Sequence, residues 1–169
     1  MPEPPDAAAL CLACGFCCDG VLHSYTVVQG DEVVPMTAMG LSVEAIQGKQ
    51  GFSQPCSLLQ AGRCTAYAQR PLTCCAYQCS LLRRYLAGEI ALDKCSRVIQ
   101  TARKQLAWVR EQGVGAGSFM RWLKTVERAD EALPGAADPS TDRLIDAELL
   151  NVTLALAVYL HRYFGRTDS

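Results

Sequence analysis

Four cysteines fall within eight residues near the N-terminus, in the run CLACGFCC, at positions Cys11, Cys14, Cys17 and Cys18. A cysteine thiolate can ligate a soft metal, pair as a disulfide or act as a nucleophile. Core packing gives no reason for thiols at this density. The run therefore predicts a metal site, although it says little about what the metal does.

Six further cysteines follow, and none lies beyond residue 95 of the 169-residue chain: Cys56, Cys64, Cys74, Cys75, Cys79 and Cys95. A secreted protein held by disulfides would spread its cysteines over the whole fold. The opening MPEPPDAAAL has neither the basic region nor the long apolar run of a secretory signal. We therefore expect a cytoplasmic protein with reduced thiols.

The four N-terminal thiols are not expected to form a complete site. If residues 11–18 were helical, these side chains would fall within an arc of about 120° on one face. One straight helix cannot wrap four thiolates around a single ion, so a second segment must complete the site or sites. Gly15 permits either the close approach of that segment or a departure from the helix.

Two downstream segments supply the remaining thiols. In PCSLLQAGRC, Gly62 permits a tight turn, which makes Cys56 and Cys64 a hairpin-like pair of ligands. In QRPLTCCAYQC, Pro71 suits the first turn of a helix that would end near Gly88. Such a helix has an apolar stripe, which gives its second and third cysteines an alternative role as small buried side chains. The stripe comprises Leu72, Cys75, Cys79, Leu82 and Leu86.

The three motifs, in this order, resemble the CxxCxxCC family, a zinc- or iron-chelating domain also called YkgJ-like. The family elements GRCxxY and RPxxC match residues 62–67 and 70–74, and the resemblance covers about residues 11–95. It implies that the metal ligands are the eight characteristic cysteines of the family. In this sequence they are Cys11, Cys14, Cys17, Cys18, Cys56, Cys64, Cys74 and Cys79.

Two cysteines depart from the family pattern. Cys75 stands where the family usually has a basic residue, and Cys95 lies outside the eight. Each is an extra ligand, a redox thiol or a packed side chain, and packing is the default for a free cysteine. His23 lies near the first motif and is a further candidate ligand, although a surface or hydrogen-bonded role is expected for it.

A set of eight sulfurs does not separate zinc from iron. Zinc accepts four thiolates in a tetrahedron, so eight could hold two closed sites. Iron–sulfur clusters also take four thiolates, and the spacing of Cys11, Cys14 and Cys17 matches the first three ligands of the bacterial ferredoxin run. The fourth ferredoxin ligand is distant and precedes a proline, whereas no cysteine here precedes one. Zinc is slightly favoured, and iron or an iron–sulfur cluster stays open.

Three classes of function remain open. The first is a metal-binding module without catalysis, which closed four-thiolate sites favour because catalytic zinc keeps an open position. The second is an iron–sulfur redox or accessory protein. The third is a component of a protein lysine methylation system, since flagellin lysine N-methylases resemble the family in their cysteine motifs. The chain shows no glycine-rich fingerprint for a nucleotide-like cofactor.

The charge is nearly balanced overall and uneven along the chain. The net charge is −1, which argues against nucleic acid as a partner. Residues 51–130 nevertheless hold twelve basic and five acidic residues, an excess of +7. We expect this excess to offset the negative charge of metal-bound thiolates. Metal ions are the expected partners; an acidic partner is the alternative for the basic excess, nucleic acid is not favoured, and the identity of any protein partner stays open.

The elements that position these motifs are expected to be mainly α, with little β. A flexible tail is predicted for residues 1–10, a cysteine-rich metal-binding domain for residues 11–95, and a helical C-terminal region packed on it for residues 96–169. One apolar stripe runs through Ile99, Ala102, Leu106 and Val109, which is typical of a helix.

Shorter elements are predicted from composition. A second helical stripe covers residues 119–133, and a last helix opens at 138–140 and ends near Gly165. Its apolar centre of about twelve residues is too short for a bilayer, which needs about 20. Residues 21–28 have the composition of a strand, residues 40–46 of a short helix, and residues 48–51 of a loop.

Overall fold

The computed structural model describes residues 5–113 and 147–165. Two predicted features, the helical stripe at 119–133 and the helix start at 138–140, lie outside these residues. The described elements are mainly helical, with two small antiparallel sheets, which confirms the predicted fold class. No helix in the described ranges is both long and apolar enough to cross a membrane.

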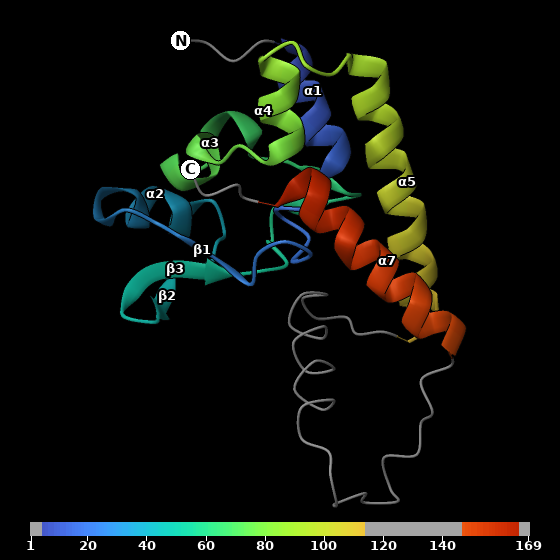
Figure 1. The fold of residues 1–169 in the computed structure, drawn as a ribbon. Coiled ribbons are helices and arrows are strands. Elements are labelled where there is room, and N and C mark those ends of the chain that lie inside the picture. The colour runs from blue at the N-terminus through green and yellow to red at the C-terminus, as the bar shows by residue number, and fades with distance from the viewer. Residues whose placement is uncertain (1–4, 114–146, 166–169) are drawn as a thin grey trace, which may run out of the picture.

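Four helices form one side of the molecule (Figure 1). They are α1 (Pro5–Cys14), α4 (Ser80–Leu86), α5 (Leu92–Glu111) and α7 (Ala147–Phe164). Helix α5 packs along α7 and also contacts α1 and α4. Their apolar faces form the first core, and α5 contributes the predicted stripe Ile99, Ala102, Leu106 and Val109 together with Cys95 and Val98.

The first core extends to the loop that follows α1. Phe16, in this loop, meets Phe164 at the end of α7 with ring centroids 5.0 Å apart and ring planes at 81°. Both side chains are almost fully buried. This edge-to-face pair is a favourable aromatic geometry. The C-terminal helix thereby holds the loop that carries Cys17 and Cys18.

A three-stranded antiparallel sheet and a short helix form the other side. The sheet has the order β1 (Tyr25–Val27), β3 (Lys49–Ser53), β2 (Glu44–Ile46). Helix α2 (Val33–Ala38) follows the 3-10 turn η1 (Gly30–Glu32). A second, smaller core forms here from Val28, Met36, Leu41 and Phe52.

Short elements connect the two sides and carry the remaining cysteines. Strands β4 (Leu59–Gln60) and β5 (Arg63–Cys64) form a hairpin. Its two turn residues, Ala61 and Gly62, have φ of 48° and 75°, as a type I′ turn requires. The 3-10 turn η2 (Tyr67–Gln69) leads to α3 (Leu72–Ala76).

The structure corrects the predictions for residues 5–10, 40–46 and 48–51. Residues 5–10 lie in α1 and are not part of a tail, and α1 ends at Cys14, so residues 11–18 are not one helix. Residues 44–46 and 49–51 are strands and not a helix and a loop. The turn Gln47–Gly48 joins them, with φ of 52° and 77°. A pair of residues with positive φ favours a hairpin over a helix.

The helix predicted from Pro71 to Gly88 is divided in two. Helix α3 ends at Ala76, Tyr77 has an extended conformation, and α4 begins only at Ser80. Tertiary contacts hold the break, because the Tyr77 hydroxyl donates to the Phe164 carbonyl at 3.1 Å and the Ser80 amide donates to the Gly165 carbonyl. Leu72 is 60% exposed, so the predicted apolar stripe does not form.

We expect Phe164→Ala to destabilise the protein by about 3–5 kcal/mol, because a buried aromatic ring is replaced by a cavity beside Phe16. Val158→Ala is the matched control on the same helix. Val158 is 69% exposed, so its loss should change stability by less than about 0.5 kcal/mol. Urea unfolding of both variants measures the difference, and similar small losses would contradict this packing.

Candidate metal centre

All eight cysteines of the predicted ligand set line one cavity of about 980 Å³. Cys75 also reaches it. The thiols come from the end of α1 and its following loop, from the segment before β4, from β5, from α3 and from the N-cap position of α4. None of the ten cysteines, all of which lie in the described ranges, forms a disulfide.

One group of four thiols gathers at the end of α1. Cys11 and Cys14 lie on its last turn at the spacing that puts them on one face, Cys17 follows in the loop, and Cys79 is the N-cap residue of α4. Burial, with Cys79 and Cys11 nearby, raises the pKa of Cys14 to about 12. Burial, with Cys14, Cys79 and Cys11 nearby, also raises the pKa of Cys17. We call these four thiols the first set.

The other four thiols gather around the hairpin. Cys18 donates a hydrogen bond to the thiolate of Cys64, which lowers the pKa of Cys64 to about 6 and raises that of Cys18. Burial and the neighbouring Cys64 raise the pKa of Cys56. Burial, with Cys56 and Cys64 nearby, raises the pKa of Cys74 to about 12. We call Cys18, Cys56, Cys64 and Cys74 the second set.

The two sets lie against different parts of the fold. Cys14 and Cys79 of the first set pack on the first core. Cys56 and Cys74 of the second set pack on the second core. The sets adjoin where Cys17 and Cys18 are consecutive: Cys74 of the second set contributes to the raised pKa of Cys17, and Cys17 contributes to the raised pKa of Cys18.

The break between α3 and α4 separates the two cysteines of the third motif. Cys74 lies on α3 in the second set, and Cys79 begins α4 in the first set. Sequence periodicity missed this break because Tyr77 is held by contacts from distant parts of the chain. Its ring also meets the edge of His23, with centroids 4.7 Å apart.

A left-handed glycine shapes the first motif. Gly15 has φ of 70°, and its amide donates to the Cys11 carbonyl, which ends α1. The Gly15 carbonyl then accepts hydrogen bonds from the amides of Cys18 and Asp19. The chain therefore leaves the helix immediately after Cys14, as one of the two alternatives for Gly15 predicted.

The same glycine allows the hairpin to approach. A Cβ atom on Gly15 would lie only 2.8 Å from the Gly62 carbonyl oxygen. The Cys56 amide also donates to the Cys18 carbonyl at 2.8 Å. These backbone contacts bring the first and second motifs together, so Gly15 serves both of the roles predicted for it.

Arginines lie near both sets. Burial raises the pKa of both Cys14 and Cys79; Arg103 opposes this rise at Cys14, and Arg83 opposes it at Cys79. Arg70 adds to the lowering of the Cys64 pKa by Cys18, and it opposes the rise that burial causes in the pKa of Cys74. The Arg70 guanidinium is held over the Tyr67 ring, 3.7 Å from its centroid. The basic excess of the central region therefore lies in part beside the thiols, as the charge distribution suggested.

The chemistry of the donors fits zinc or iron, because thiolates are the ligands that both metals accept. Among the described residues, however, no three or more His, Cys, Asp or Glu side chains are arranged to hold a metal ion. The thiols line one cavity without converging on a single point. Metal binding would therefore require these thiols to lose protons and to draw together.

The remaining candidates have separate environments. Cys95 is fully buried in the first core, which confirms packing as its role. Cys75 is exposed, and its thiol donates to the Arg70 carbonyl at 3.4 Å, so the prediction that it is packed is wrong. His23 lines the cavity beside Tyr77.

Comparison with known proteins supports metal binding. A family model named CxxCxxCC, described as "Putative zinc- or iron-chelating domain", matches residues 10–108. No curated protein and no solved structure matches the chain. The matched range includes all ten cysteines and most of α5.

We expect Gly15→Ala to destabilise the protein by more than Gly48→Ala. The φ angles of Gly15 and Gly48 are 70° and 77°, and a left-handed alanine costs roughly 1–2 kcal/mol at either position. A Cβ on Gly48 meets open space, whereas one on Gly15 meets the Gly62 backbone. This contact should add about 1–3 kcal/mol. Urea unfolding gives the comparison, and equal losses would mean that the close approach is unimportant.

Proposed function

The chain belongs to the CxxCxxCC family, and on that premise we propose that it binds two metal ions or clusters through eight cysteine thiolates, four at each site. The observation that carries this proposal is that Cys14 and Cys79 pack on the first core, whereas Cys56 and Cys74 pack on the second. The first site would use Cys11, Cys14, Cys17 and Cys79. The second would use Cys18, Cys56, Cys64 and Cys74.

Each proposed site has a complete set of sulfur ligands. Zinc is satisfied by four thiolates in a tetrahedron, and such closed sites stabilise folds and leave no position for a substrate. We therefore infer a metal-stabilised module and not a metalloenzyme. Because thiolate ligands must stay reduced, the proposed location of the protein is a reducing compartment such as the cytoplasm.

The chain's own groups would assist metal binding in two ways. The Cys18 hydrogen bond lowers the pKa of Cys64, so this thiol would lose its proton more readily than its neighbours. The thiols must release protons on binding, and the energy of binding then also stabilises the fold. Four thiolates around a divalent ion carry a formal charge of about −2, which the nearby Arg70, Arg83 and Arg103 partly offset.

An iron–sulfur centre is a second candidate for the first set. Three of its members have the C-x₂-C-x₂-C spacing, and the fourth, Cys79, comes from far along the chain. Bacterial ferredoxin clusters use the same combination of three close cysteines and one distant cysteine. Such a cluster would supply electron transfer, which would make the protein a redox or accessory protein.

We expect protein purified without oxygen to contain about two zinc ions, or iron with acid-labile sulfide if clusters are bound. Cys14→Ser should remove the metal of the first set and retain that of the second, because serine lacks the soft sulfur ligand. Cys64→Ser should have the opposite result. Elemental analysis, with a sulfide assay and a visible spectrum, measures each outcome.

Cys75→Ser is the matched control. Its thiol is exposed and lies next to the proposed ligand Cys74, so the variant should keep its full metal content. Loss of metal in this variant, or full metal in both Cys14→Ser and Cys64→Ser, would show that the two sets are wrongly assigned. Wild-type protein with neither zinc nor iron would refute metal binding itself.

A further inference from the structure

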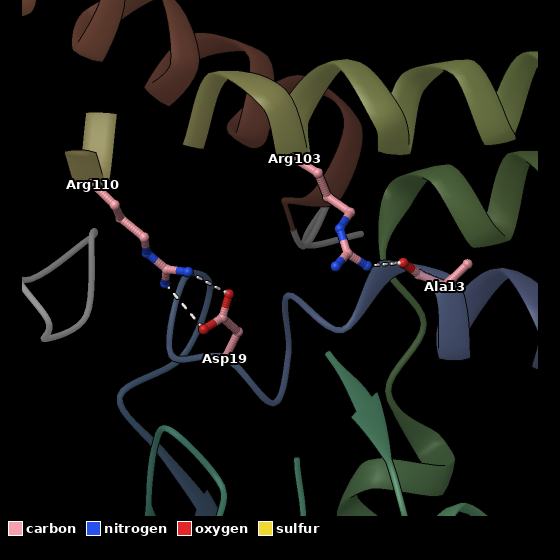
Figure 2. Close-up of polar contacts among 4 residues, drawn as sticks. All are labelled: Ala13, Asp19, Arg103 and Arg110. Atoms are coloured by element: carbon pink, nitrogen blue, oxygen red, sulfur yellow. Dashed lines mark hydrogen bonds and ion pairs between the residues drawn. The ribbon is translucent and has the colours of Figure 1, made fainter. Parts of the chain in front are cut away.

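Two arginines of α5 contact the first motif at its two ends (Figure 2). Arg103 donates from Nη1 to the Ala13 carbonyl at 2.5 Å, immediately before Cys14. Arg110 donates from both Nη atoms to the two carboxylate oxygens of Asp19, each at 3.0 Å, immediately after Cys18. The two arginines are seven residues apart, or about two helical turns and 10.5 Å along α5.

The Arg103 contact completes the end of α1. The last carbonyl groups of a helix have no partner within the helix. A guanidinium group at this position satisfies one of them and interacts favourably with the negative end of the helix dipole. The hydrogen bond therefore fixes where α1 ends and where the loop with Cys17 and Cys18 begins.

Arg103 also touches the hairpin. A Cβ atom on Gly62 would lie 2.8 Å from Arg103 Nη2, so the guanidinium lies directly against the hairpin turn. Cys64 follows this turn by two residues. One side chain thus contacts both segments that carry the N-terminal and hairpin thiols.

The contact between Arg110 and Asp19 fixes the position of the Asp19 carboxylate, and it contributes little to stability. Its side chain is 38% exposed and that of Asp19 is 25% exposed, and exposed ion pairs contribute little to stability. The two parallel hydrogen bonds nevertheless fix both position and angle of the carboxylate. Asp19 is the residue after Cys18, so its position constrains that of the adjacent thiol.

We propose that Arg103 and Arg110 are positioning residues that hold the loop from Cys14 to Cys18 so that its thiols face both metal sites. This inference rests on the proposed metal binding. Groups that orient the ligands of a metal affect its affinity even when they do not touch it, typically by about 10–100-fold. The long helix α5 would thereby serve as the rigid support of a short and irregular loop.

The test is titration of the full-length protein with Co²⁺ and Zn²⁺ against a competing chelator. Arg103→Met keeps the aliphatic stem and removes the hydrogen bond, and Arg110→Lys keeps the charge and removes the paired geometry. Each should lower metal affinity by about 10–100-fold. Arg97→Met is the control, because Arg97 lies on the same helix and pairs with the exposed Asp93, one turn away. It should bind as wild type.

Two further measurements separate positioning from plain stabilisation. Asp19→Asn should weaken metal binding as Arg110→Lys does, and the double variant should show no additional loss, because both changes remove the same contact. The thiolate-to-Co²⁺ absorption bands should also change in these variants and not in Arg97→Met. Arg103→Lys, which can still donate to the Ala13 carbonyl, should recover part of the affinity lost in Arg103→Met.

Equal affinity in the Arg103, Arg110 and Arg97 variants, with wild type binding two ions, would overturn the positioning role and leave metal binding intact. The role would also be refuted if affinity fell only in proportion to a loss of unfolding free energy in metal-free protein. Absence of Co²⁺ and Zn²⁺ binding in wild type would instead refute the proposed function, and the positioning role with it.

Discussion

The close contact between two backbones, at Gly15 and Gly62, is the constraint on which the rest of the structure depends. Neither position tolerates a side chain without displacing its neighbour, and both have φ of 70–75°. Through this contact the loop after α1 meets the tip of a hairpin that is otherwise only two residues long on each strand. Together with the hydrogen bond from the Cys56 amide to the Cys18 carbonyl, it brings the cysteines of the first and second motifs to one cavity. The cavity they share therefore follows from two glycines as much as from the thiols.

The C-terminal helix takes part in the same arrangement, although it holds no cysteine. Phe164 packs on Phe16 in the loop, and its carbonyl accepts a hydrogen bond from Tyr77. The next carbonyl, that of Gly165, accepts one from the Ser80 amide, beside Cys79. The end of α7 thus contacts two of the three cysteine motifs. Phe164 and Gly165 lie beyond the range of the family model, 10–108, and yet they contact the cysteine motifs. Helix α7 therefore packs as part of the same unit as the cysteine region.

Sequence reasoning predicted the features that depend on local chemistry. The helical stripe of α5, the turn at Gly62 and the departure from helix at Gly15 follow from periodicity and from glycine conformations. The break at Tyr77 does not, because its partners, Phe164 and His23, are far away in sequence. The strands at 44–53 were missed for a related reason. Both strands are short, and the Gly51 backbone lies close against β1. The conformation of this segment therefore depends on strand pairing more than on its amino-acid composition.

The consecutive cysteines Cys17 and Cys18 explain why two groups of thiols occur in such a small region. Cys17 belongs to the first set and Cys18 to the second, so a single peptide bond connects the two sets. A change that moves the backbone of one residue must move the other, since the peptide unit between them is planar and rigid. Two metal sites built on these sets would therefore share a constraint on their geometry. The Cys17–Cys18 dipeptide would then couple the first core to the second, and the arginines of α5 hold the loop in which that coupling occurs.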